Sequence, residues 1–231
     1  RKRGKLRGLG IGSYLEVTAP PGKEMGGVRF EADGTVTIIS GTLDYGQGHA
    51  APFAQVLSEK LGIPFDRIRL LQGDSDELIA GGGTGGSRSI TATGMAIVEA
   101  SAKVIEKGKA IASHVLEASA SDIEFTQGRF VIAGTDRSIG IMELAQKLRT
   151  GIALPGDAPQ SLDVSHATEP VPSSFPNGTH IAEVEIDPDS GEVTIVKYSS
   201  ANDFGTIVNP LMVAGQVHGG VVQGLGQVLL E

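Results

Sequence analysis

Two glycine-rich stretches, each followed directly by a helix pattern, constrain this chain more than any other feature. The first is "LDYGQGHAAPFAQVLSEKLGIP", from Leu43 to Pro64, and the second is "GGGTGGSRSITATGMAIVEA", from Gly81 to Ala100. The first amides of a helix have no partner inside the helix, and they carry the positive end of its dipole. Since glycine lacks a Cβ, it lets an anion approach such amides. The stretches therefore predict either tight turns leading into core helices or sites for an anion such as phosphate.

The side chains in both stretches are compatible with either interpretation. In the first, Gly46 and Gly48 flank Gln47, whose amide can donate and accept hydrogen bonds. His49 follows, and it either donates to a phosphate or simply begins the helix. In the second, three hydroxyls and one guanidinium that suit phosphate oxygens accompany the glycines: Thr84, Ser87, Ser89 and Arg88. Two such stretches in one chain make an anion site as strong an interpretation as turns alone.

The second stretch also matches a familiar nucleotide-binding pattern, but its surroundings do not. Gly81, Gly83 and Gly86 satisfy G-x-G-x-x-G. A dinucleotide-binding turn connects a strand to a helix directly, whereas the acidic run "GDSDE" separates this stretch from the preceding strand pattern. No lysine follows the glycines, so the stretch is not a P-loop either. We therefore do not expect a nicotinamide or nucleoside triphosphate site.

The composition excludes several classes of protein. No cysteine occurs among the 231 residues, so this chain provides no disulfide, zinc–thiolate site or iron–sulfur ligand. Outside the five cations of "RKRGKLR", 14 Lys and Arg stand against 27 Asp and Glu, a net charge of −13. With no Trp and 4% aromatic residues, we expect no nucleic-acid partner. No apolar run reaches the length of about 18 residues that a transmembrane helix needs, and we expect a soluble, cytoplasmic protein.

The histidines do not form a metal-binding pattern. No H-E-x-x-H motif occurs, and no pair stands at the spacing of metal ligands. A G-x-S-x-G nucleophile motif is also missing. We therefore predict no catalytic residue and no protein-ligated metal among the five histidines, which are His49, His114, His166, His180 and His218.

Hairpin and helix signals alternate along the chain. Asp33-Gly34 and Gln127-Gly128 predict hairpin turns, and "PDSG" predicts a turn between two long strands. Because strict βαβ alternation is missing, the order predicts an α+β fold with mixed sheets and packed helices. The expected helices cover 51–62, 87–118, 138–148 and 210–231, and the expected long strands cover 8–19, 179–187 and 192–203.

We expect three parts along the chain. Residues 1–150 form a first subdomain with both glycine-rich stretches, 151–177 form a crossover loop, and 178–231 hold two long strands and a glycine-rich terminal helix. Asp203 and Asn209 follow the last strand. They predict either an Asx-type turn with Asn209 as a helix N-cap, which we favour, or hydrogen-bond partners for a ligand at the glycine-rich stretches.

Three stretches together resemble one known family. They are "GQGHAAPFAQVLSEKLGIP", "GGGTGGSRS" and "NDFGTIVNPLMVAGQVHGGVVQGLGQVLLE", and "GIGSYLEVTA" fits as an entering strand. In order and spacing they resemble the molybdenum-binding large subunit of the xanthine dehydrogenase, aldehyde oxidase and aerobic carbon monoxide dehydrogenase family. The resemblance runs from about Arg7 to Glu231, and it implies a truncated C-terminal cofactor-binding portion of such a subunit.

The resemblance implies a cradle for molybdopterin with molybdenum, in bacteria its cytosine dinucleotide form. Gln47 would approach the pterin and the molybdenum oxo group, and Gly48 and His49 would line the side between pterin and phosphate. The pterin and pyrophosphate would be held by Thr84, Gly85, Gly86, Ser87, Arg88 and Ser89. The distal part of the cofactor would meet Asp203, Asn209 and Gln216. The pterin dithiolene would ligate molybdenum, so the missing cysteines are compatible with this assignment.

The family hydroxylates a small molecule, such as carbon monoxide, an aldehyde or a heterocycle, with water as the oxygen source. Electrons leave through iron–sulfur and FAD subunits or domains of the same enzyme, commonly in an oligomer. The glutamate base of the family lies in a G-x-G-E motif, which does not occur in this sequence. The resemblance therefore implies a chain that is inactive by itself, with an exposed surface where further domains would dock.

Three alternatives remain open from the sequence. One is a non-catalytic module that binds phosphate or nucleotides through the same stretches. Another is a naturally split subunit that completes its site with a second chain. The third is a structural domain in which every glycine serves a turn.

Overall fold

The computed structural model describes residues 4–19 and 22–231, which divide into two compact units. Unit 1 comprises Arg1–Ala19 and Ser173–Ile207, and unit 2 comprises Pro20–Pro172 and Val208–Glu231. Each unit thus joins segments that lie far apart in the sequence. The three parts expected at 1–150, 151–177 and 178–231 describe the order of motifs along the chain, and as functional divisions they stay predictions.

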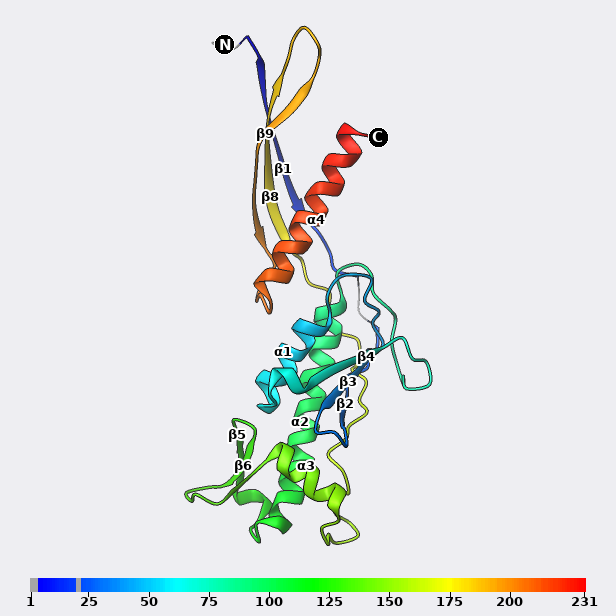
Figure 1. Ribbon diagram of the computed structural model, residues 1–231, viewed down its shortest axis with the longest axis vertical. Helices are drawn as coiled ribbons and strands as arrows, with labels where there is room; N and C mark the ends of the chain where they lie inside the picture. The colour runs from blue at the N-terminus through cyan, green and yellow to red at the C-terminus, as the bar shows by residue number, and fades with distance from the viewer. Residues whose placement is uncertain (1–3, 20–21) are drawn as a thin grey trace. The chain divides into compact units, whose positions relative to one another are not determined.

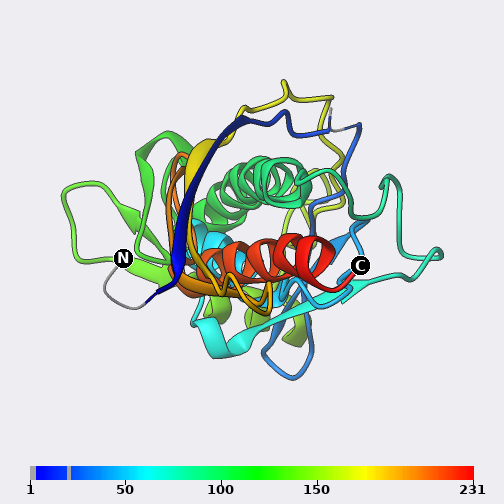
Figure 2. The ribbon, with the colours of Figure 1, turned by 90° about the horizontal axis from the view of Figure 1, so that it is seen from above.

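Unit 1 is a single antiparallel sheet. Strands β1 (Leu6–Leu15), β8 (Asn177–Ile186) and β9 (Val193–Asp203) pair in the order β1-β8-β9. The three long strands run alongside one another, with β1 in dark blue at one edge (Figures 1 and 2). The turn between β8 and β9 forms as "PDSG" predicts, because the Asp187 carboxylate accepts hydrogen bonds from the amides of Asp189 and Ser190.

The first sheet of unit 2 comprises β2 (Gly27–Phe30), β3 (Val36–Ser40) and β4 (Ile68–Gln72) in the order β2-β3-β4. Both glycine-rich stretches follow strands of this sheet, the first after β3 and the second after β4. The β2–β3 hairpin turns at Asp33-Gly34, where Gly34 adopts a φ of +79°, as the sequence predicts. Strands β3 and β4 are parallel, so the chain crosses between them through a helix.

Two helices pack on one another in unit 2 (Figure 1). The crossover helix α1 (Ala50–Leu61) ends at the left-handed Gly62, whose amide donates to the Ser58 carbonyl. The longer helix α2 (Ser89–Val115) begins at the end of the second glycine-rich stretch. Both helices bury an apolar side against the sheets, and the largest fully buried side chains of this core include Phe53, Leu57, Leu61, Ile97, Ile111 and Phe130.

A second small sheet covers the far part of α2. Strands β5 (Ile123–Thr126), β6 (Arg129–Ile132) and β7 (Ser138–Gly140) are antiparallel, and helix α3 (Ile141–Thr150) follows. The short 3-10 helices η1 (Phe65–Arg67) and η2 (Ala120–Asp122) precede β4 and β5. The β5–β6 turn lies at Gln127-Gly128, as predicted from the sequence.

The start of α3 corrects one sequence prediction. We expected Ser138 to open this helix, but Ser138 lies in β7, and the helix begins three residues later at Ile141. The residues before the helix pair with β6, from Arg129 opposite Gly140 to Val131 opposite Ser138. The hydrogen bonds of this added edge strand therefore override the local helix-start signal.

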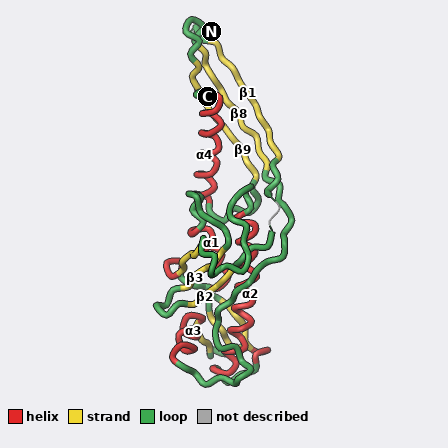
Figure 3. The backbone as a smooth tube through the Cα atoms, turned by 90° about the vertical axis from the view of Figure 1, so that its right-hand side faces the viewer, coloured by secondary structure: helices red, strands yellow, loops and turns green. Residues whose placement is uncertain are grey.

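The last helix, α4 (Pro210–Leu229), has no buried residue in the described chain. Apolar side chains along it are exposed, among them Leu211 at 80% and Val228 at 80%. Strands and helices together form the expected α+β fold with small mixed sheets (Figure 3). None of the helices in the described ranges is both long and apolar enough to cross a membrane.

Candidate functional site

The two glycine-rich stretches meet at a backbone contact between Gly41 and Gly81. A Cβ atom built on Gly41 would lie against the Gly81 Cα and 2.5 Å from the carbonyl oxygen of Ala80. The amide of Gly83 donates to the carbonyl of Gly41 over 3.1 Å. Only glycine allows two backbones to approach this closely. These positions therefore bring together the segments that lead into the N-terminal ends, or mouths, of α1 and α2. We call residues 41–49 the first loop and residues 80–88 the second loop.

In the first loop, one carboxylate accepts three backbone hydrogen bonds. Asp44 Oδ1 accepts from the amides of Gly46 and Gly48 over 2.8 and 3.1 Å, and Oδ2 accepts from the amide of His49 over 2.7 Å. Partial burial acts to raise the pKa of Asp44, but these three donors outweigh it and hold the pKa below its ordinary value. From the sequence, these amides were candidates for binding a phosphate. In the structure they bind the Asp44 carboxylate instead.

The side chain of Gln47 is held by its carbonyl end. Its Oε1 accepts a hydrogen bond from the Tyr45 amide over 2.6 Å. The remaining polar atom of the side chain is Nε2, which is a donor only. Gln47 is half-buried, and its Nε2 offers two N–H groups to a ligand.

His49 lies at the N-cap position of α1, with its imidazole turned into the protein. The side chain is 5% exposed and stacks on Phe53 with ring centroids 5.1 Å apart. The Gln72 amide nitrogen donates to Thr42 Oγ1, and it lies 3.2 Å from His49 Nδ1. An amide nitrogen can only donate, so Nδ1 accepts and the neutral ring carries its proton on Nε2. Burial lowers the pKa of His49, which keeps the ring neutral, although Asp44 acts in the opposite direction.

A threonine hydroxyl connects the two loops. Thr84 Oγ1 accepts from the amide of Leu43 in the first loop and from Ser89 Oγ at the start of α2, both over 3.2 Å. Between them, Ser87 adopts a left-handed conformation with a φ of +57°. This conformation is unfavourable for a serine and is found where the surroundings enforce it, often at functional sites.

The second loop carries the cationic group of the site. Arg88 donates from Nη2 to the Gly82 carbonyl over 2.5 Å, and it forms no salt bridge in the described ranges of the chain. Beneath the loops, the buried Glu24 carboxylate accepts from the amides of Gly41 and Met25 over 2.8 and 2.9 Å. Burial raises the pKa of Glu24, while these donors and the charge of Arg88 lower it in part.

The helix mouths differ in how their first amides are satisfied. Neither α1 nor α2 has a side-chain cap or an acidic residue in its first turn. In contrast, Asn209 caps α4 by accepting from the Met212 amide over 3.0 Å, as the sequence predicts. The Asp44 carboxylate already places a negative charge beside the start of α1, because it accepts from the amide of the N-cap residue His49. The start of α2, beside Arg88, is therefore the better place for an external anion.

The predicted residues of the two loops lie at the starts of α1 and α2, Asn209 and Gln216 belong to the cap and body of α4, and Asp203 lies in unit 1. Asn209 donates from Nδ2 to Gln55 Oε1 on α1 over 2.7 Å, which joins the start of α4 to the first loop's helix. A Cβ on Gly48 would lie within 3.3 Å of the Met212 sulfur. Gln216 is exposed on α4, and Asp203 accepts from the Gly205 amide in the predicted Asx-type turn.

The sequence did not single out the supporting residues Asp44, Tyr45, Glu24 and Gln72. The signal for Asp44 was present, since an aspartate before glycines commonly accepts amides two residues later. Glu24 gave no such signal, because it acts on segments distant in sequence. Within the described residues, no group of three or more His, Cys, Asp or Glu side chains could hold a metal ion.

Comparison with known proteins identifies the family. The model of the molybdopterin cofactor-binding domain matches residues 1–231. This chain belongs to that family. A molybdopterin cofactor-binding domain needs donors for the oxygen and nitrogen atoms of a pterin with a phosphate group, and the two loops provide such donors.

Several known proteins are similar to this chain in sequence or structure. The large subunit of nicotine 6-hydroxylase from Paenarthrobacter nicotinovorans is 35% identical, covering all of this chain and 30% of that protein. Subunit gamma of the 6-hydroxypseudooxynicotine dehydrogenase complex from the same organism is 33% identical, with coverage of 100% and 29%. A structure of CO dehydrogenase from Oligotropha carboxidovorans matches with a TM-score of 0.83 and 31% identity, covering 95% of this chain and 29% of that one. The chain thus spans about 30% of the length of its relatives.

Proposed function

We propose that this chain binds molybdopterin, in its cytosine dinucleotide form, as part of the large subunit of a molybdenum hydroxylase. The observation that carries the proposal is the junction of the two loops at Gly41 and Gly81, which joins the loop that contains Gln47 to the loop that contains Arg88 and leads into the uncapped α2. The family match and the similarity to large subunits that act on nicotine and carbon monoxide support it.

The two loops divide the work of holding the cofactor. The second loop receives the pyrophosphate, because its helix amides are not capped by a side chain and Arg88 adds a positive charge. Residues Thr84, Gly85, Gly86, Ser87 and Ser89 surround it. The first loop presents the Gln47 Nε2 donors to acceptor atoms of the pterin–molybdenum end, with Gly48 and His49 beside it.

The remaining predicted residues lie toward the distal end of the cofactor. Asn209 already uses both ends of its amide, to Met212 and Gln55, so its contribution is to fix the start of α4 beside the first loop. Gln216 is exposed and available to a ligand. Asp203 stays a proposed contact from unit 1.

When bound, the molybdenum cofactor supplies the redox chemistry that adds oxygen from water to a small substrate. The substrate is carbon monoxide, an aldehyde or a heterocycle, and iron–sulfur and FAD partners take up the electrons in an oligomeric cytoplasmic enzyme. This chain's residues bind and orient the cofactor. Because no G-x-G-E motif occurs in the sequence, we expect no turnover by the chain alone with an artificial electron acceptor.

A second candidate is a module that binds phosphate or nucleotides without catalysis. The uncapped mouth of α2 with Arg88 favours it, because such a site accepts any phosphate.

One experiment separates the two candidates. The chain is produced in cells that make molybdopterin, purified, and assayed for pterin by fluorescence after oxidation and for CMP released by acid. The cofactor-binding function predicts pterin and CMP in equal amounts. Bound nucleotide without pterin would support the second candidate and overturn the first.

A further inference from the structure

We propose that Asp44 is a positioning residue, whose carboxylate shapes the first loop so that Gln47 faces the cofactor as a hydrogen-bond donor. The proposal rests on the proposed function, since it names the residue that prepares Gln47 for the cofactor. Asp44 itself is not placed in contact with the ligand, because both of its oxygens are engaged within the loop.

The first step is the fold of the loop around the carboxylate. Gly46 and Gly48 adopt φ values of +109° and +73°, which turn their amides toward a common point. Asp44 occupies that point and accepts from both, and also from His49 at the start of α1. The carboxylate therefore replaces an external anion at this helix mouth and forms the loop without a ligand.

The second step is the orientation of Gln47, which lies between the two glycines held by Asp44. With the backbone fixed on both sides, the Gln47 side chain folds back so that Oε1 accepts from Tyr45 N. Oε1 is then directed toward the backbone of the loop, and Nε2 is the end of the side chain that carries no hydrogen bond to the described chain. The two N–H groups of Nε2 recognise an oxygen-rich group, because oxygen atoms accept hydrogen bonds from such a donor.

The third step is the contrast with the other carboxylates that accept backbone amides. Asp187 accepts from Asp189 and Ser190 in the β8–β9 turn, where the Ser190 hydroxyl accepts from the Glu192 amide over 3.2 Å. No glutamine or asparagine, and so no side-chain amide to orient, occurs between Asp187 and Glu192. The same type of contact thus closes an ordinary turn at Asp187 and orients an amide at Asp44. Asp187 serves as the matched control.

The test measures amide hydrogen exchange by NMR in the full chain without ligand, for wild type, Asp44→Asn and Asp187→Asn. Asparagine keeps the shape of the side chain but replaces one acceptor oxygen by a donor. In Asp44→Asn we expect exchange protection to fall about tenfold at Gly46, Gly48, His49 and also Tyr45, and the Gln47 side-chain amide signals to shift; a factor of ten corresponds to about 1.4 kcal/mol. In Asp187→Asn these signals should stay unchanged.

Two results would overturn the proposal. One is a variant Asp44→Asn in which the glycine amides lose protection while Tyr45 and the Gln47 side chain are unchanged, since Asp44 would then hold the loop without orienting Gln47. The other is a wild-type chain in which these amides are unprotected. Molybdopterin content is measured separately. Absence of molybdopterin from the wild-type chain would refute the proposed function. The exchange experiment would still test whether Asp44 orients Gln47.

Discussion

Replacing Gly41 by alanine tests whether the backbone contact between the loops organises the site. The new Cβ would meet the Gly81 Cα, lie 2.5 Å from the Ala80 carbonyl oxygen and lie 2.9 Å from Glu24 Oε1. Two of these three neighbours are backbone atoms, which cannot rotate away. Overpacking of this kind costs about 1–3 kcal/mol, and in a chain of this size each kcal/mol lowers the melting temperature by about 2–4 °C. We therefore expect a fall of roughly 2–12 °C.

The measurement is thermal unfolding by circular dichroism, with Gly156→Ala as the matched control. A Cβ on Gly156 meets nothing within 4 Å, and its φ lies outside the left-handed range, so this variant should stay within about 0.5 kcal/mol of wild type. We also expect Gly41→Ala to weaken pyrophosphate binding. A Gly41→Ala variant with an unchanged melting temperature and unchanged pyrophosphate binding would refute the claim that this contact joins the loops.

Two further predictions concern buried positions of unit 2. In Gly108→Ala the new Cβ would lie 2.6 Å from Cε1 of the fully buried Phe130, so we expect a loss of about 1–3 kcal/mol in denaturant unfolding, without a selective effect on the loops. Burial lowers the pKa of His49, so its stabilising contribution is complete above about pH 6.5, the unfolded value, and is lost as the pH falls toward the folded pKa. The free energy of unfolding measured from pH 7.5 to 5 should fall less in His49→Gln than in wild type, and an equal fall would contradict this assignment.

Local features of the fold could be predicted from the sequence where a short segment carries its own signal. The turns at Asp33-Gly34 and Gln127-Gly128 and the cap at Asn209 depend on residues within four positions of each other. Pairing of β1 with β8 could not be predicted, because the two strands are more than 150 residues apart and no local pattern selects the partner.

The candidate site could be predicted in part. The glycines, Gln47 and Arg88 were apparent because they stand at helix starts, but the sequence left the amides of Gly46 and Gly48 free for a ligand. In the structure, both amides donate hydrogen bonds to Asp44. The buried Glu24 was missed because its partner Gly41 is 17 residues away and burial cannot be read from a single carboxylate.

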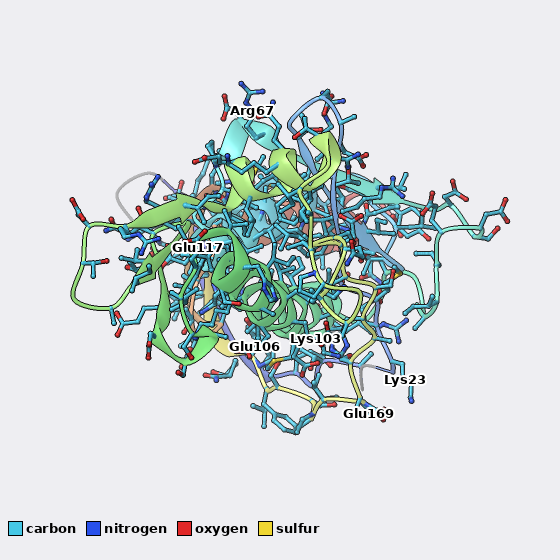
Figure 4. All side chains as sticks on the ribbon, turned by 90° about the horizontal axis from the view of Figure 1, so that it is seen from below. Lys23, Arg67, Lys103, Glu106, Glu117 and Glu169 are labelled. Carbon is cyan, nitrogen blue, oxygen red and sulfur yellow. The ribbon has the colours of Figure 1, made fainter. Side chains whose placement is uncertain are left out.

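Contacts between charged side chains of unit 2 also could not be predicted from the sequence. Lys23 and Glu169, both labelled in Figure 4, form an ion pair over 2.9 Å, although 146 positions separate them. Lys103 on α2 donates to His166 Nδ1 over 2.8 Å. His166 Nε2 in turn lies 2.5 Å from Glu99. These contacts fasten the segment around His166 to α2, and such tertiary contacts are invisible in sequence spacing.

The most direct test of cofactor binding at the second loop is calorimetric titration of the full chain with CDP, which carries the pyrophosphate and cytosine groups of the proposed cofactor. Wild type is compared with Arg88→Ala and with Arg129→Ala, whose guanidinium bonds to Ser138 on the other sheet of unit 2. The account predicts saturable binding that weakens about tenfold or more in Arg88→Ala, as expected for a charge-assisted contact, and is unchanged in Arg129→Ala. Equal binding by all three chains, or no binding by wild type at millimolar CDP, would contradict it.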